Sequence, residues 1–374
     1  MLVTYKQLTA IVANYVATNK IAQDSPFVPS VDNIAGLVDK ISKIVMLDGK
    51  YEDKLALLDG EDLPLGKTIE EYYQDISAPL DYDATGASAL SPHLPTFRPA
   101  CYSYTLGRKK FATTERYNDL ERACNTEGEF ETMVGTITKK LWDSFAVYKY
   151  QIKRELLGKY AGAAITEQNT AAIYAVSTAY DVNTILKSVA NSEVRGIVVK
   201  AITSTSYATT NTWAANVSAG YIVELDLVKS MAIPTDEATG ESFIEQLKKD
   251  VELASDISEG HSLNGNALGV SEAGLVLFVK QGVMPVIDTK VLAGAFHTDK
   301  VAIPSEVIVV KDFGSDSNDV YAVLMDRRGC RVHNDYRAIR TQLNADGDFM
   351  NYFLHTENTA FWSKNTFIKV YKDI

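Results

Sequence analysis

Residues 63–76 read LPLGKTIEEYYQDI, and this stretch decides how the whole chain is interpreted. It comes close to a phosphate-binding loop, in which a glycine, four residues and then Gly-Lys-Ser/Thr open a helix. Here Gly60 and Gly66 enclose five residues, and Pro64 stiffens a loop whose backbone amides would have to wrap a phosphate. After Thr68, carboxylates and aromatic side chains alternate instead of forming an amphipathic helix. The stretch therefore favours a solvent-reaching β-arm that binds a neighbouring copy of the protein over a nucleotide site.

The same stretch opens a long, weakly hydrophobic excursion from residue 62 to about residue 118. Its midpoint, 78–99, is rich in proline and serine, whereas 68–76, 102–106 and 110–114 are rich in β-forming residues. Two extended arms around a Pro/Gly-rich tip predict a long β-hairpin. Loops of this length are usually functional or disordered, and the aromatic and charged content of this one favours contact with a partner.

The strongest periodicity of the chain begins shortly afterwards. Apolar side chains recur at steps of three or four residues, at Phe130, Val134, Ile137, Leu141, Phe145, Tyr148, Ile152 and Leu156. This stripe predicts one helix over 129–159, about 45 Å long at ~1.5 Å per residue. Gly158 and Gly162 are expected to end it. A single-faced helix of this length is typical of a spine laid across a sheet. The alternative is a coiled-coil helix, but only this one long helix is evident in the sequence.

The other segments predict helices and strands in turn. Further helices are expected after Thr4 and over 31–45, 241–254 and 289–296. Strands are expected at 196–200, 221–225, 275–279, 307–310, 321–325, 347–355 and 361–371. The strands at 275–279 and 307–310 should be buried, and with the helix between them they describe a compact α/β subdomain.

Length and charge limit the classes of protein that fit. At 374 residues, the chain exceeds the ~250–300 residues at which one hydrophobic core stops growing, so two or three subdomains are expected. The formal net charge is −11 and the densest basic cluster, 108–110, is short, so we expect neither tight nucleic-acid binding nor attachment to an anionic membrane. The 3 cysteines are an odd number and lie far apart, which indicates a reduced intracellular chain without a disulfide framework. No signal peptide or membrane span is expected.

Catalytic and metal-binding patterns are weak throughout the sequence. The histidines form no HExxH pair and lie at no zinc-finger spacing from a cysteine. His297 with Asp299 is more typical of a helix end than of a metal pair. Glu70 and Glu71 are neighbours on a strand, so their side chains should point to opposite faces and cannot converge on one substrate. We therefore predict no catalytic residue, no metal and no cofactor, and a protein that is not an enzyme.

The order of these features resembles the HK97 fold of the major capsid proteins of tailed bacteriophages. Within that fold, the sequence is most similar to the major head proteins of short-tailed phi29-like phages, whose β-arm opens with a pattern like residues 64–76. The likeness continues at 94–95 (LP), through the tyrosine-rich helix, at 287–296 (IDTKVLAGAF) and at 351–355 (NYFLH). It covers most of the chain from about residue 60 onward. We recognise no counterpart for 163–234, and we expect no C-terminal immunoglobulin-like domain of the kind that some such head proteins carry.

The resemblance implies an α+β chain with an HK97-like organisation. Residues 1–60 would form an N-terminal arm with helices, and 61–118 an extended β-hairpin called the E-loop. Residues 119–162 would form the spine helix of the peripheral (P) domain, and 319–374 its closing strands. The axial (A) domain, of α/β type, would be 163–318, with 163–234 as an inserted β-rich segment.

The implied function is that of a major capsid protein. Its copies would form the hexamers and pentamers of an icosahedral or prolate shell around a double-stranded DNA genome. A scaffolding protein and a portal would take part in assembly in the host cytoplasm, and the acidic wall of the virion would contact DNA only weakly.

The resemblance also implies where neighbouring subunits meet. Each E-loop would lie over the spine helix and P-domain of the next subunit, with Gly66 allowing the arm to bend and Pro64 fixing its start. The acidic edge of the arm would meet basic residues of that neighbour. The expected contact residues are Pro64, Gly66, Lys67, Glu70, Glu71, Tyr73, Asp75, Lys109, Lys110 and Arg116.

Other interpretations stay open from the sequence. An encapsulin-type nanocompartment shares the fold and would enclose a cargo enzyme in place of a genome. A P-loop enzyme would need Lys67 to bind its nucleotide. A tail or decoration protein would form rings, tubes or trimers instead of closed shells.

Overall fold

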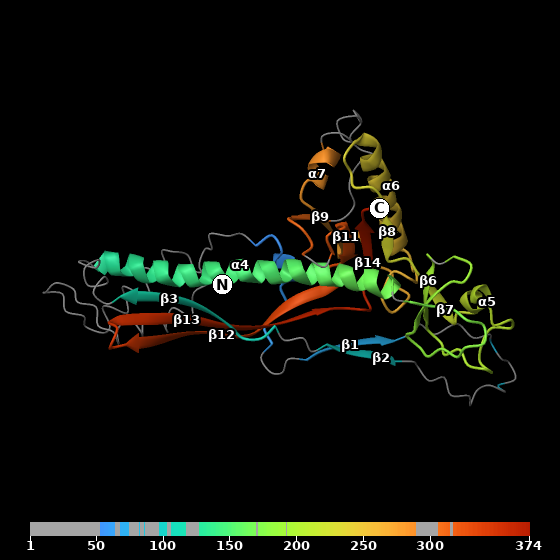
Figure 1. Cartoon of the computed structure of the whole chain (residues 1–374), viewed down its shortest axis with the longest axis horizontal. Coiled ribbons are helices and arrows are strands. Elements are labelled where there is room, and N and C mark those ends of the chain that lie inside the picture. Colours follow the sequence, from blue (N-terminus) through green and yellow to red (C-terminus); the bar gives the residue numbers. More distant parts are fainter. Residues whose placement is uncertain are drawn as a thin grey trace. The chain divides into compact units, whose positions relative to one another are not determined.

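The structure, a computed structural model, describes residues 53–63, 68–74, 82, 86, 97–102, 106–116, 127–169, 171–191, 193–288, 306–314 and 317–374 (Figure 1). The two helices expected before residue 46, most of the Pro/Gly-rich tip and the helix expected at 289–296 lie outside these residues. The chain divides into two compact units. The first comprises Met1–Lys67, Tyr104–Lys153 and Val332–Ala360, and the second comprises Thr68–Ser103, Arg154–Arg331 and Phe361–Ile374.

The first unit is built on a sheet in the order β12 (Cys330–Asn344), β13 (Phe349–Trp362) and β3 (Lys109–Arg116). β13 and β3 are antiparallel, with Phe349 opposite Arg116. The strand β3 therefore pairs with a segment that lies more than two hundred residues later in the sequence.

Helix α4 (Glu127–Asn169) contributes its first part to this unit and packs on the sheet (Figure 1). The Phe111 ring of β3 meets the Phe145 and Tyr148 rings edge-on, with ring centroids 6.2 Å and 5.6 Å apart. Such pairs add to the free energy gained by burying the rings. The predicted apolar stripe is confirmed where side chains are described, because Leu141, Phe145, Ile152 and Leu156 are buried and Tyr148 is half-buried.

The predicted end of this helix is wrong, because α4 continues through Gly158 and Gly162 to Asn169. A Cβ atom at Gly158 would lie 1.7 Å from the carbonyl oxygen of Phe313. The Ser317 hydroxyl also donates to the Gly158 carbonyl oxygen at 2.7 Å. Gly158 therefore allows a backbone segment to lie directly against the helix and does not end it.

The second unit is built on a larger, mixed sheet. Its strand order is β10 (Glu306–Val310), β9 (Leu275–Lys280), β11 (Val320–Asp326), β14 (Ile368–Lys372) and β8 (Val228–Ser230). The outer pairs β10–β9 and β14–β8 are parallel, and β11 is antiparallel to both of its neighbours. Every residue of β11 is buried, as expected for a central strand.

The edge of this sheet corrects one prediction. The strand expected at 307–310 is present as β10, but it is not buried as a whole, because β10 lies at the sheet edge and leaves Val309 exposed. The strand expected at 275–279 is confirmed as the buried β9. A short helix, α7 (Val283–Val286), follows β9.

Helix α6 (Glu237–Ser255) covers one face of the larger sheet (Figure 1). Asp236 and Thr239 form a capping box, in which each side chain accepts the backbone N–H of the other. Phe243, Leu247 and other apolar residues of the helix share a core with β9, β11 and β14. The helix expected over 241–254 is confirmed, with one extra turn at its start.

A smaller sheet in the second unit has the order β4 (Ala172–Ile173), β5 (Ile185–Lys187), β6 (Arg195–Val198) and β7 (Ile222–Leu225). Helix α5 (Trp213–Ser218) accompanies it. Its core is formed by Tyr174, Leu186, Val198, Ile202 and Ile222. The predicted strands at 196–200 and 221–225 are therefore confirmed, and they belong to a sheet of their own.

The predicted hairpin is present as β1 (Ile69–Gln74) paired antiparallel with β2 (Phe97–Tyr102). Ile69 lies opposite Tyr102 and Gln74 opposite Phe97. The returning strand is thus 97–102, earlier than the expected 102–106. The segment expected to extend it, 110–114, belongs instead to β3 in the first unit.

Two closing strands also differ from the prediction. The strand expected over 361–371 is divided, since β13 ends at Trp362 and β14 begins at Ile368. The 15-residue strand β12 was not predicted. Its buried positions change phase between Asn334 and Ile339, so it lacks the continuous alternation that identifies a strand in a sequence.

Candidate intersubunit surfaces

Part of the predicted contact set can be placed in the structure. Pro64, Gly66, Lys67 and Asp75 lie outside the described residues. The structure places the remaining predicted residues on two strands, with Glu70, Glu71 and Tyr73 on β1 and Lys109, Lys110 and Arg116 on β3. The acidic residues belong to the second unit and the basic residues to the first.

One face of β1 is held by its own unit. The Ser363 hydroxyl lies 2.7 Å and 2.8 Å from the two carboxylate oxygens of Glu71. The Tyr73 hydroxyl donates to the carbonyl oxygen of Ala267 at 3.3 Å. Because alternate strand residues share a face, Glu71 and Tyr73 together form the inward face of β1.

The other face of β1 carries Glu70 and Tyr72. The Tyr72 hydroxyl donates to Glu70 Oε2 at 2.6 Å, and the Tyr72 residue is 69% exposed. We call these two residues the outward face of β1. The opposite orientation of Glu70 and Glu71 is as predicted, whereas Tyr72 was missed. The alternation of side chains along a strand predicts its position, because Tyr72 is two residues from Glu70 and therefore lies on the same face.

The residues of β3 divide between the two faces of its sheet. Thr113 accepts a hydrogen bond from Lys140 of α4 at 3.0 Å, so the odd-numbered side chains face the helix. Lys109 shares that parity but is exposed at the start of the strand. Lys110 and Arg116 therefore lie on the face away from α4.

That second face combines cations with aromatic rings. Lys110 Nζ lies 5.4 Å from the centroid of the Phe353 ring, and Thr114 donates to Asn351 Oδ1 at 2.6 Å. Arg116 stands at the end of the same row. We call Lys110, Thr114, Arg116, Asn351 and Phe353 the basic sheet face. A partner that presents a carboxylate and an aromatic ring would match its chemistry.

A charged cluster in the first unit fixes the segment that precedes the hairpin in sequence. Lys153 of α4 is fully buried and forms ion pairs with Asp53 and Asp59, the latter at 2.6 Å. Lys149, one turn earlier, lies 2.7 Å from Asp59. Burial lowers the pKa of Lys149, although the Asp59 carboxylate opposes that shift. The cluster ties residues 53–59, which include the 3₁₀ turn at Ala56–Leu58, to the helix.

Backbone hydrogen bonds continue this attachment along β12. The amide of Gly60 donates to the Val332 carbonyl at 2.9 Å, and the amide of Leu63 donates to the Asn334 carbonyl at 3.0 Å. A Cβ atom at Gly60 would lie 2.3 Å from the His333 ring. Gly60 is the first glycine of the sequence that nearly matches a phosphate-binding loop. In the structure it lets the backbone pack closely against the His333 ring.

Sequence reasoning missed this cluster, because lysine side chains are rarely fully buried. A signal was present, since Lys149 and Lys153 are four residues apart and directly follow Tyr148 and Ile152 of the apolar stripe. Residues with that spacing share one side of a helix.

A second buried ionic cluster lies in the larger sheet. Lys369 of β14 is fully buried, and its Nζ lies 2.5 Å from Asp226 Oδ2 and 3.8 Å from Asp250 Oδ1. The Tyr371 hydroxyl donates to Asp250 Oδ2 at 2.7 Å. Partial burial alone would raise the pKa of Asp226, but neighbouring His261 and Lys369 hold it well below its usual range. Lys369, Tyr371 and the two carboxylates contact one another and form a structural network.

The described residues provide no metal-binding group, no deprotonated thiol and no helix able to cross a membrane. They contain no group of three or more His, Cys, Asp and Glu side chains that could hold a metal ion. Burial raises the pKa of Cys330 to about 12, so its thiol stays protonated at neutral pH. Among the helices described, none is long and apolar enough to cross a membrane.

Curated proteins from two phages are similar to this chain. The major capsid protein of Bacillus phage PZA is 23% identical over 341 residues, which cover 89% of this chain and 62% of that protein. The major capsid protein of Bacillus phage B103 is 22% identical over 325 residues, 86% of this chain and 59% of that protein. The chain thus spans about three fifths of the length of the curated relatives it matches.

Solved structures show the same fold at much lower identity. A chain in the capsid structure of Staphylococcus phage Andhra matches with a TM-score of 0.58 and 10% identity, covering 87% of this chain and 86% of that chain. A chain in the structure of the head fiber and inner core protein gp22 of native bacteriophage P68 matches with a TM-score of 0.57 and 11% identity, covering 88% and 87%. The mixed α+β fold is therefore one that occurs in phage particles.

The match to a family model covers more of this chain than the pairwise matches described above. The model of the Phi29-like phage major capsid protein matches residues 12–367, nearly the whole chain. It extends over both units and across the 163–234 segment for which the sequence alone suggested no counterpart. The chain belongs to the Phi29-like phage major capsid protein family.

Proposed function

We propose that copies of this chain assemble into hexamers and pentamers of an icosahedral or prolate shell that encloses a double-stranded DNA genome. The observation that carries this proposal is the match of the family model to residues 12–367. The family also favours a phage head over an encapsulin-type compartment and over a P-loop enzyme. The protein would act by assembly and not by catalysis.

The parts of the chain take the following roles in this proposal. The β1–β2 hairpin serves as the E-loop, which lies within 61–118. Helix α4 serves as the spine helix of the P-domain; it begins within 119–162 and extends beyond that range to Asn169. The smaller sheet, α6 and the strands β8, β9 and β10 serve as the A-domain, within 163–318. Residues 319–374, which also contribute β11 and β14 to the larger sheet, close the P-domain. Residues 1–60 act as the N-terminal arm.

The partners follow from the same role. A scaffolding protein and a portal would take part in assembly in the host cytoplasm, and the finished shell is part of the virion. The net charge of −11 supports weak contact with packaged DNA, because an acidic wall repels phosphates at short range.

The contact between neighbours uses the outward face of β1 and the basic sheet face. Glu70 and Tyr72 of one subunit meet Lys110, Arg116 and Phe353 of the next. The support is chemical complementarity, a carboxylate and a phenol against two cations and a ring. Each exposed ion pair contributes only ~0–1 kcal/mol, but a closed shell repeats the contact many times. The inward residues Glu71 and Tyr73 keep the hairpin attached to its own subunit.

A charge exchange tests this contact. Glu70→Lys should reduce the yield of closed shells, and adding Lys110→Glu and Arg116→Glu to the same chain should restore it, because the attraction returns with opposite sign. Glu193→Lys, an equal change at an exposed residue outside both faces, is the matched control. Shells are counted by negative-stain electron microscopy after assembly with scaffolding protein.

The outcomes separate the parts of the proposal. Failure of the unaltered chain to form shells or capsomers, even with scaffolding protein, contradicts the capsid function itself. Normal shells from Glu70→Lys contradict the contact and leave the function standing.

A further inference from the structure

A pocket in the second unit is lined by two loops that connect elements of the smaller sheet. Residues 176–179 come from the loop between β4 and β5, and residues 203–204, 207 and 209–211 come from the loop between β6 and α5. The pocket has a volume of about 630 Å³, which lies within the ~300–1,000 Å³ usual for ligand sites. Six of its ten lining residues are serine or threonine and one is tyrosine. We call it the hydroxyl pocket.

The lining of the hydroxyl pocket is accessible to a ligand. Val176 is 52% exposed and Tyr207 is 39% exposed, and every other lining residue except the half-buried Asn211 is exposed as well. Within the described part of the chain, the pocket hydroxyls without a hydrogen-bond partner are those of Ser177, Thr178, Ser204 and Thr209. Each hydroxyl can donate one hydrogen bond and accept two, so these groups are available to a bound molecule.

A buried polar network ties the two loops together. The buried Asn216 accepts the Ala208 amide at 3.0 Å and donates to the Tyr174 hydroxyl at 2.8 Å. Tyr174 donates to Asn211 Oδ1 at 2.7 Å, and the Asn211 side chain donates to the Val176 carbonyl oxygen. Asn211 has φ +42°, in the left-handed region that residues other than glycine rarely adopt. The network therefore holds the pocket in a preformed shape.

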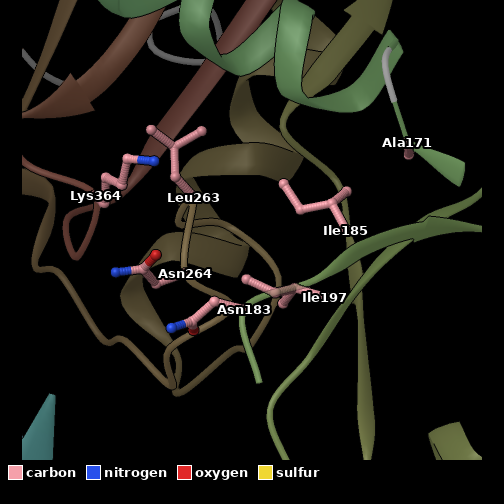
Figure 2. Close-up of a pocket in the computed structure, with 7 residues that line it drawn as sticks. All are labelled: Ala171, Asn183, Ile185, Ile197, Leu263, Asn264 and Lys364. Carbon is pink, nitrogen blue, oxygen red and sulfur yellow. The ribbon is translucent and has the colours of Figure 1, made fainter. Parts of the chain in front are cut away.

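A second pocket of the smaller sheet, shown in Figure 2, lacks this access. Its volume is about 530 Å³, and Ile197 and Lys364 are among the residues that line it. Ile197 and Leu263 are each only 1% exposed, and the Asn264 side chain donates to Asn365 Oδ1 at 2.7 Å. Such a lining offers a ligand little free surface, so the hydroxyl pocket is the better candidate for a binding site.

The chemistry of the hydroxyl pocket favours one class of ligand. None of its ten lining residues carries a charge, so an ionic ligand would lose its hydration there without gaining a counter-ion. Its hydroxyls match a partner that both donates and accepts hydrogen bonds. The Tyr207 ring adds a flat apolar surface, next to the smaller one of Val176. A sugar ring has this combination, with hydroxyl groups around its edge and C–H groups on its faces.

We propose that the hydroxyl pocket binds a neutral carbohydrate. One sugar ring stacks on Tyr207, and its hydroxyl groups form hydrogen bonds with Ser204 and Thr209. This activity goes beyond shell assembly, because a single chain contains the whole site. It can therefore be measured on the full chain whether or not that chain has assembled.

Binding is measured by saturation-transfer difference NMR with oligosaccharides of known structure. The neutral probes are maltotriose, mannotriose and triacetylchitotriose, and the charged probe is trigalacturonic acid. We expect at least one neutral trisaccharide to bind and trigalacturonic acid to bind at least tenfold more weakly, because no lining residue can pair with its carboxylates.

Variants connect the binding to the pocket. Tyr207→Ala should weaken binding of the neutral probe about tenfold, since it removes the ring on which the sugar stacks. Tyr207→Phe keeps that ring and should retain most of the affinity. Ser204→Ala together with Thr209→Val should weaken binding severalfold, because two hydrogen-bonding groups are lost. Tyr336→Ala is the matched control, because Tyr336 is 38% exposed and lies outside the pocket.

The outcomes either support the inference or overturn it. Thermal unfolding of every variant should match that of the unaltered chain, so that a loss of binding reports the site and not the fold. Absence of binding by all three neutral probes overturns the inference, as does equal binding of trigalacturonic acid. Unchanged affinity in Tyr207→Ala would place the sugar elsewhere and also overturns it. None of these results bears on the shell function, which the assembly of the unaltered chain tests separately.

Discussion

The larger sheet and the β1–β2 hairpin belong to the same unit but use their residues in opposite ways. In β11 every side chain is buried, and Lys369 on neighbouring β14 is buried beside Asp250 and pairs with the more exposed Asp226. In β1 one face is attached to its own unit through Glu71 and Tyr73, while Glu70 and the largely exposed Tyr72 lie on the other face. The sheet is completed within one chain, whereas we propose that the outward face of the hairpin contacts a neighbouring subunit. Substitutions in the sheet should therefore change folding, and substitutions on the outward face should change assembly.

The largest loss of unfolding free energy is expected from Lys369→Ala. Removing this ammonium group leaves Asp250, which is 0% exposed, without its nearby cation. Breaking a buried ion pair from one side costs about 3–5 kcal/mol of unfolding free energy. Urea unfolding followed by circular dichroism measures the loss. An unchanged midpoint would contradict the structural role given to the cluster.

A smaller loss is expected from Gly158→Ala. The added methyl group would overlap the Phe313 carbonyl, which is backbone and can yield only if the packed segment moves. Overpacking of this kind costs about 1–3 kcal/mol. Val147→Ala, on an exposed position of the same helix, should leave the unfolding midpoint nearly unchanged. If Gly158→Ala stabilised the protein, as alanine does in an unobstructed helix, the packing explanation would fail.

Acid should weaken the second unit through Asp226. Its pKa is held below the usual value by His261 and Lys369, so its contribution to stability is complete above the unfolded pKa of ~3.9. That contribution is lost as the pH falls from there toward the folded pKa, because the unfolded chain takes up the proton first. Asp226→Asn should therefore flatten the decline in unfolding midpoint below about pH 5. Asp181→Asn, at an exposed carboxylate, should keep the same decline as the unaltered chain.

The smallest effect on folding is expected from Tyr72→Ala. The side chain is largely exposed, and surface substitutions usually change stability by less than ~0.5 kcal/mol. Shell yield should nevertheless fall clearly, because the phenol is part of the outward face. If Tyr72→Ala lost stability in proportion to its loss of shell yield, the outward face would affect folding as the sheet does. That result would contradict the distinction between the sheet and the hairpin.

The sequence predicted those features whose cause is local. The stripe through Leu141 and Phe145 identified α4, and the alternation at Glu70 and Glu71 correctly assigned opposite faces. Gly158 led to a wrong prediction of the helix end. The sequence does not distinguish a glycine that ends a helix from one that lets a neighbouring backbone segment lie against it. The pairing of β3 with β13 joins Arg116 to Phe349, and nothing near either residue indicates the other.

The candidate surfaces were predicted in part for the same reason. Charge and aromatic content predicted contact with a partner for the hairpin, and the resemblance implied Lys110 as a contact residue, without showing which face each would occupy. Lys153 and Lys369 were missed because their burial depends on Asp53, Asp59 and Asp226, which are distant in sequence. The pocket at Ile197 and Lys364 is likewise assembled from three separate segments, and only the folded chain brings them together.

Cross-linking within assembled shells tests the central claim most directly. A chain carrying Tyr72→Cys and Lys110→Cys is assembled with scaffolding protein, oxidised and separated on a denaturing gel without reductant. Each single substitution serves as a control for native Cys101, Cys124 and Cys330. We predict a ladder of covalent oligomers that reaches pentamers and hexamers in the double variant alone. Closed shells that yield only monomers on that gel would contradict contact between the hairpin and the neighbouring basic sheet face.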